Sequence, residues 1–272
     1  MERAVKSQRQ IGCVLKIENL FQKNFFDSLE QVNAICSNIP SFVGYHSNNC
    51  SFSEQDGKDL ITEYLNFYFN KDCRQDLNSF FNYAAYSDDE ELWSVIGKPY
   101  QHRIHEVIIP TPNNIYNIIC ICHEFFHYMN FKKLSFYYDN LINSEFFSIL
   151  NEFLFADYLD EKKYFKNSNV YEYIYKDRFN IDLNVNICAD MNQCITNNFD
   201  FLENLGYYLS NINANRMVNI YHEDKKAFLK HYRALLTKAL KIEYVLDYYN
   251  VSITNDKTRN TTFDLIKKYY LK

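Results

Sequence analysis

The segment CHEFFHYMN, residues 122–130, carries two histidines four positions apart, with a glutamate directly after the first. Residues four apart lie on one face of an α-helix, so His123 and His127 can direct two imidazole nitrogens at one point. Two imidazoles suit Zn²⁺, which binds nitrogen ligands at about 2.0–2.1 Å. Glu124 would then lie close enough to take a proton from a water that the metal activates. This is the arrangement of the H-E-x-x-H motif, which predicts metal-dependent hydrolysis.

An ordinary helix core is the alternative interpretation of the same residues. H-E-x-x-H is expected by chance in about one sequence in a hundred of this histidine and glutamate content. The residues around the motif are apolar and would bury the helix: Ile118, Ile119, Ile121, Phe125, Phe126, Tyr128 and Met129. Burying two histidines and a carboxylate without partners is costly, whereas one metal ion satisfies all three. The zinc interpretation is therefore favoured.

A catalytic zinc site needs a third protein ligand and one open coordination position. Lys133 stands where the metzincin motif has its third histidine, which excludes that class. Acids follow at Glu145, Glu152 and Asp157. Glu145 and Glu152 are two helical turns apart, so both can face the motif helix, one as a ligand and the other bound to a ligand histidine. The spacing predicts a glutamate as the third ligand and leaves the choice between these two open.

The stretch SEFFSILNEFLFADYL, residues 144–159, contains the pattern E-x-x-S-x-x-N-E-x-x-x-x-D-Y-L. It resembles the helix that follows the H-E-x-x-H helix in the oligoendopeptidase F and thimet-oligopeptidase family. The resemblance implies a gluzincin-type zinc peptidase with a zincin-like fold, in which Glu145 is the third zinc ligand and Glu152 lies beside a ligand histidine. The chain departs from the family at Phe126, where the family usually has Gly, and in a shorter connection between the second histidine and the glutamate.

The segment LGYYLSNINANR, residues 205–216, resembles the glycine-tyrosine-tyrosine segment of the same family. The resemblance implies that Tyr207, or Tyr208 beside it, helps to hold the substrate carbonyl in the transition state. The histidine that precedes these tyrosines in the family has no match here. His222 and His231 are alternative donors for this role, although histidines of this kind more often lie on a solvated surface.

A second resemblance is to the short regulatory zinc peptidases of the IrrE/ImmA type. The segment NEFLFADYL, residues 151–159, is similar to the part of those proteins where a glutamate precedes an A-[ND]-x-[FL]-like sequence. On this interpretation Glu152 is the third zinc ligand.

The elements that must position these residues are mainly helices. Only 5 Gly and 4 Pro occur in 272 residues, too few for a turn-dense all-β protein. Apolar residues at three-four spacing predict helices over these ranges: 14–39, 56–86, 115–131, 134–165, 198–222 and 223–249. Residues 104–109 have a strand pattern that ends at Pro110, directly before the motif helix. In zincins this strand pairs with extended substrate, so His102 and His105 are expected to line the substrate cleft, with plain solvent exposure as the alternative.

The predicted fold is mainly α, of the α+β class: a zincin-like domain with a small sheet packed beside the H-E-x-x-H helix. No linker or repeat divides the chain, so residues 1–272 are predicted to form one compact unit. Within this unit we expect an N-terminal helical region (1–95), a catalytic core (96–216) and C-terminal helices (217–272).

The bulk composition excludes several kinds of partner and location. A formal net charge of -5 without a long basic run argues against nucleic acid as a partner. No stretch approaches the roughly 18 uncharged apolar residues of a membrane-spanning helix, and the N-terminus lacks the apolar segment of a Sec signal peptide. We expect the protein in the cytoplasm, or exported without such a signal, for example into a host cell. Its 8 cysteines are predicted to be reduced thiols.

Together these observations predict a zinc-dependent metallopeptidase that acts on a peptide or protein, with Glu124 as general base. A first alternative is a dedicated protease that cuts one regulatory or host protein, in contrast to a general oligopeptidase. A second alternative is a binding module in which zinc is structural. In that case protein atoms would fill all four coordination positions, with Cys122 or Glu152 added to the ligands.

Overall fold

The computed structural model describes most of the middle of the chain and a part of its C-terminal third. The described residues are 52–69, 73–98, 103–133, 145–164, 170, 174, 207, 210, 211, 214 and 216–237. The helix predicted over 14–39 and the candidate residues His102 and Tyr208 lie outside these ranges. The predicted division of the chain into three regions stays a prediction.

The described elements are mostly helices, with one small sheet among them. In chain order they are α3 (Glu54–Phe69), α4 (Arg74–Tyr83), β1 (Ala84–Tyr86), the 3-10 helix η1 (Glu90–Leu92), β2 (Ser94–Lys98), β3 (Arg103–Ile109), α5 (Ile115–Lys133), α6 (Phe146–Glu161) and α10 (Lys225–Thr237). Residues 216–223 are helical as well. The predicted fold, mainly α and of the α+β class with a small sheet beside the H-E-x-x-H helix, is confirmed.

The three strands form a sheet in the order β1-β3-β2, and the predicted strand 104–109 lies within β3. β1 is parallel to β3, with Ala84 opposite Val107, and β2 is antiparallel to it, with Val95 opposite the same residue. β2 extends along β3 from Arg103 to Ile108, whereas β1 pairs only with Val107–Ile109 on the other edge. His105 is exposed, and the expectation that this strand pairs with substrate stays a prediction.

The sequence patterns miss β1 and β2. The apolar spacing predicts helix over 56–86, whereas the structure divides this range into α3, α4 and β1. β1 has 3 residues and β2 has 5, which is too short for an alternating pattern to stand out. Strands this short owe their conformation to the partner strand, a tertiary effect that local sequence does not contain.

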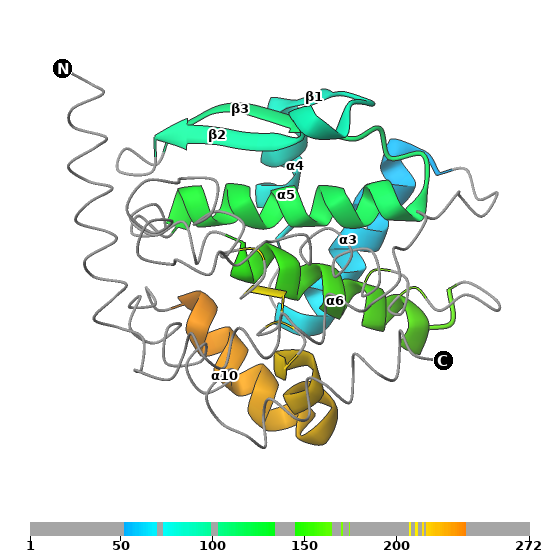
Figure 1. The fold of residues 1–272 in the computed structure, drawn as a ribbon, viewed down its shortest axis with the longest axis vertical. Helices are drawn as coiled ribbons and strands as arrows, with labels where there is room; N and C mark the ends of the chain where they lie inside the picture. Colours follow the sequence, from blue (N-terminus) through cyan, green and yellow to red (C-terminus); the bar gives the residue numbers. More distant parts are fainter. Residues whose placement is uncertain are drawn as a thin grey trace, which may run out of the picture.

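The motif helix α5 is the middle layer of the described structure. Its start is capped by Asn114, whose Oδ1 accepts a hydrogen bond from the backbone N–H of Asn117 at 2.9 Å. In Figure 1 the sheet lies on one side of α5 and α6 on the other, and both the sheet strands β2 and β3 and the helix α6 pack against α5. The H-E-x-x-H motif is thus held between a sheet and a second helix.

The second helix, α6, is buried along almost its whole length, from Phe146 to Leu159. A helix that is apolar on all sides belongs in a core. Four of its buried residues are nevertheless polar: Ser148, Asn151, Glu152 and Asp157. Since buried polar groups are costly without partners, their surroundings are informative about function. Neither α6 nor any other helix in the described part of the chain has the length and apolar character to cross a membrane.

Candidate metal centre

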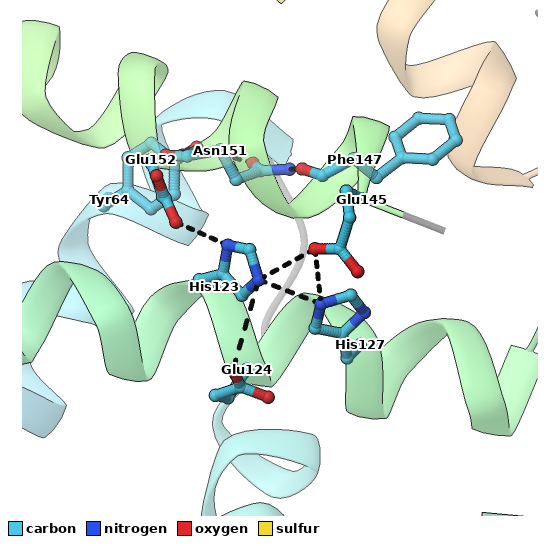
Figure 2. A network of polar contacts seen from close by, with 8 residues as sticks. All are labelled: Tyr64, His123, Glu124, His127, Glu145, Phe147, Asn151 and Glu152. Carbon is cyan, nitrogen blue, oxygen red and sulfur yellow. Dashed lines mark hydrogen bonds and ion pairs between the residues drawn. The ribbon is translucent and has the colours of Figure 1, made fainter. Parts of the chain in front are cut away.

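His123 and His127 on α5 and Glu145, the residue directly before α6, bring three potential ligand atoms together (Figure 2). The two Nε2 atoms are 2.9 Å apart, and each lies 3.2 Å from Glu145 Oε2. In a tetrahedral zinc site with bonds of 2.0–2.1 Å, neighbouring ligand atoms lie about 3.3 Å apart. The triangle formed by the three atoms therefore has the size that a zinc ion requires.

The chemistry of these three groups also fits a metal. Imidazole nitrogen and carboxylate oxygen are both zinc ligands in their deprotonated forms. Two histidines and one glutamate form a ligand set that is found in catalytic zinc sites, where the fourth position is left to water or substrate. All three residues are buried or nearly so, with side-chain exposures of 8% for His123, 14% for His127 and 10% for Glu145.

Glu152 lies on the other side of the His123 ring. One of its carboxylate oxygens, Oε1, contacts His123 Nδ1, while Nε2 of the same ring faces His127 and Glu145 (Figure 2). A carboxylate at Nδ1 fixes the ring orientation and the tautomer of a ligand histidine. The structure thus places Glu145, and not Glu152, on the side of the ring where the three atoms converge.

Glu124 lies beside this triangle of atoms without being part of it. Its Oε1 is 4.0 Å from His123 Nε2, and the residue is buried with 8% exposure. The side chains of His123, Glu124 and His127 form a group whose potential ligand atoms all lie within 4.8 Å of one another. This position suits a carboxylate that transfers protons next to a metal, because such a group must reach the reacting water.

The electrostatics of the metal-free cluster are dominated by the opposite charges of its imidazoles and carboxylates. Burial lowers the pKa of His123, but the nearby carboxylates, Glu152 first, outweigh burial and raise this pKa to about 10. Burial raises the pKa of Glu145, but the two imidazoles, His127 first, outweigh it and hold this pKa well below its usual range. At neutral pH the metal-free cluster therefore holds a protonated His123 beside an ionised Glu145.

Zinc binding is expected to release about one proton from His123 at neutral pH. Below its pKa of about 10 this histidine is protonated, and only the neutral imidazole binds a metal. The apparent zinc affinity should therefore rise by about tenfold per pH unit from about pH 7 to pH 9. Calorimetric titration with zinc in two buffers of different ionisation enthalpy measures the number of protons released. An affinity that stays constant over this range would contradict the protonated state of His123.

The remaining candidate residues lie in other surroundings. Tyr207 is partly buried and packs against the hydrophobic core, and its catalytic role stays a prediction. His222 pairs with Asp157, since its Nε2 lies 3.0 Å from Asp157 Oδ1. His231 belongs to α10. His222, a candidate donor from the sequence, and Asp157, a candidate ligand, are thus paired with each other.

Asp157, Glu161 and His222 form a second group whose potential ligand atoms lie within 4.8 Å of one another. Glu161 and His222 are exposed, and Lys225 Nζ lies 3.5 Å from Glu161 Oε2. A lysine cation at this distance already compensates one carboxylate and repels a metal ion. The hydrogen bond from His222 to Asp157 raises the pKa of this histidine. We interpret the group as an ion-pair cluster that joins α6 to the C-terminal helices.

Comparisons with known proteins identify the fold. Neither a protein-family model nor a curated protein matches the chain. Two solved structures align with 96% of it: a candidate oligoendopeptidase F of Bacillus anthracis str. Ames, with a TM-score of 0.53 and 11% identity, and a candidate peptidase of Chlamydophila abortus, with a TM-score of 0.51 and 14% identity. The alignments cover 56% and 54% of those chains, so this chain spans about half of their length. The chain therefore has a fold similar to that of structures described as peptidases.

Proposed function

We propose that the protein is a zinc-dependent metallopeptidase of the gluzincin type, acting on peptides or proteins. The observation that carries the proposal is the convergence of His123 Nε2, His127 Nε2 and Glu145 Oε2 within 3.2 Å of one another. Glu124 lies beside them at a distance suited to proton transfer. The similarity in fold to two structures described as peptidases is further support.

In this proposal His123, His127 and Glu145 are the residues that hold zinc. When bound, zinc supplies a Lewis acid that activates water and polarises a carbonyl group. Glu152 accepts the Nδ1 proton of His123, which leaves the Nε2 lone pair directed at the other two ligand atoms. Because Glu152 already engages Nδ1, we propose Glu145 as the third ligand in preference to Glu152.

Glu124 is the proposed general base of peptide hydrolysis. Its carboxylate removes a proton from water while the water oxygen forms a bond to the carbonyl carbon. It then delivers this proton to the amide nitrogen as the C–N bond breaks, so that a carboxylic acid and an amine are formed. Tyr207 is proposed to donate a hydrogen bond to the carbonyl oxygen as negative charge develops there.

Zinc-dependent cleavage of a peptide panel tests the proposed activity. We expect the zinc-loaded protein to hydrolyse quenched fluorescent peptides, and we expect a chelator to abolish this hydrolysis and added zinc to restore it. Short unstructured peptides are the expected substrates of a general oligopeptidase. A dedicated protease should leave them intact and cut one folded protein, which N-terminal labelling of a treated protein extract would detect.

The non-catalytic alternative makes a different prediction for the same samples. A module with structural zinc should cleave neither the peptides nor any protein in the extract, and removal of the metal should unfold it. Circular dichroism of the chelated protein separates the two cases. A metal-free protein that keeps its helical signal, together with zinc-dependent cleavage, supports the peptidase.

A further inference from the structure

Asn151, the residue directly before Glu152, is the centre of a buried hydrogen-bond network. Its Oδ1 accepts hydrogen bonds from the hydroxyls of Tyr64 and Tyr232, each at 2.6 Å. Its Nδ2 donates to the backbone carbonyl of Phe147 at 2.6 Å. Asn151 and both tyrosines are fully buried. Figure 2 shows Asn151 and Tyr64 next to the metal centre, above the ring of His123.

The network joins three helices that are far apart in the sequence. Tyr64 comes from α3, 87 residues before Asn151, and Tyr232 from α10, 81 residues after it. Burial raises the pKa of both tyrosines well above the ordinary value, so both hydroxyls stay protonated donors. An amide oxygen that accepts two hydroxyls is satisfied on both lone pairs, which fixes its position between α3 and α10.

The position of Asn151 bears directly on the metal centre because Glu152 follows it on the same helix. Neighbouring residues of an α-helix point about 100° apart, so anchoring one side chain sets the direction of the next. Glu145 lies about two turns before Glu152 and faces the same neighbour, α5. A small rotation of α6 about its axis would therefore move both carboxylates away from His123 at once.

Cys122, the residue directly before His123, is fully buried. Burial, first, and then the charge of Glu152 raise the pKa of its thiol well above the ordinary value. The thiol therefore stays protonated at neutral pH.

We propose that Asn151, held by Tyr64 and Tyr232, is a positioning residue of the metal centre: it sets the rotation of α6, so that Glu152 meets His123 Nδ1 and Glu145 meets the Nε2 atoms. This inference rests on the proposed function, since it concerns how the zinc ligands are oriented. A purely structural role would instead make the network one more polar contact of the core, with no particular effect on the metal.

Tyrosine-to-phenylalanine variants separate these two roles. Tyr64→Phe, Tyr232→Phe and the double variant remove the donors to Asn151 without emptying the core of aromatic rings. Tyr68→Phe is the matched control, because Tyr68 is a fully buried tyrosine one turn further along α3, and its ring lies 5.0 Å from that of Tyr64. Three quantities are measured for each variant: zinc affinity by competition with a chromophoric chelator, the visible spectrum of the cobalt-substituted protein, and urea unfolding of the metal-free protein.

Each single variant is expected to lower zinc affinity by about twofold, because Asn151 Oδ1 still accepts a hydrogen bond from the other tyrosine. The double variant is expected to lower zinc affinity by about tenfold, because Asn151 Oδ1 then has neither tyrosine donor. The double variant should also shift the cobalt absorption bands, which report on the geometry of the ligands. Tyr68→Phe should lower the urea midpoint and leave zinc affinity and the cobalt spectrum unchanged. Should the double variant fail to fold, the two single variants are compared with Tyr68→Phe in the same way.

Variants of Tyr64 and Tyr232 that behave like Tyr68→Phe, destabilised but with wild-type zinc affinity and cobalt spectrum, would overturn the positioning role alone. A wild-type protein that binds neither zinc nor cobalt would overturn the proposed function together with this role. Normal metal binding without any cleavage would overturn only the proposed peptidase activity.

Discussion

Replacing Glu124 with glutamine is expected to leave the zinc content unchanged and to lower kcat by about 10²–10⁴-fold. Glutamine has the size of glutamate but cannot accept the proton of the attacking water. Glu124 Oε1 lies 4.0 Å from His123 Nε2, outside the triangle of ligand atoms, so its charge is not needed to hold the metal. Zinc is measured by elemental mass spectrometry, and kcat on the substrate that the peptide panel or the labelled extract identifies.

Glu106→Gln is the matched control, because it removes the charge of an exposed glutamate on β3. This variant should keep both its zinc and its activity. If Glu124→Gln loses zinc to the same extent as it loses activity, Glu124 is a ligand and not the base. Unchanged turnover would remove Glu124 from the chemistry altogether.

Glu145→Ala is expected to reduce zinc from about one ion per chain to near zero after purification without added metal. Glu145 Oε2 lies 3.2 Å from both imidazole Nε2 atoms, so its removal leaves only two protein ligands. Zinc sites of catalytic type have three, and two imidazoles from one helix do not hold the ion tightly. Elemental mass spectrometry of the purified variant measures this loss directly.

Glu152→Gln is the comparison that distinguishes the two candidate ligands. Glu152 contacts His123 Nδ1, and changes at such outer partners typically cost about 10–100-fold in metal affinity while the site survives. We therefore expect this variant to bind zinc when the ion is supplied in excess. The reverse result, zinc kept by Glu145→Ala and lost by Glu152→Gln, would show that Glu152 is the third ligand. Circular dichroism of each metal-free variant shows that the fold is kept.

The local part of the candidate metal centre could be predicted from the sequence alone. His123 and His127 are four residues apart, and the helical repeat by itself puts them on one face of α5. The strand before this helix, and the helical periods of α5 and α6, are equally local patterns. The scarcity of Gly and Pro also indicated a mainly helical chain, because the many turns of an all-β protein depend on these residues.

The different positions of Glu145 and Glu152 around His123 were decided by the tertiary structure. The two residues are two turns apart on one face, so the sequence period allows either to meet α5. Which of them reaches the Nε2 side of His123 depends on the level at which α6 crosses α5. The strand order is tertiary in the same sense: β3 is central because the short strands β1 and β2 pair with it on both sides.

The network around Asn151 shows why such information is absent from sequence patterns. Its partners Tyr64 and Tyr232 are 87 and 81 residues away, in a chain with 24 tyrosines, and nothing in their local spacing singles them out. Helical periods describe neighbours within a turn or two, whereas the packing of α3, α6 and α10 brings these hydroxyls to one amide. The sequence by itself determined the pair of histidines and the glutamate between them, and the packing of the helices decided which carboxylates and hydroxyls surround that pair.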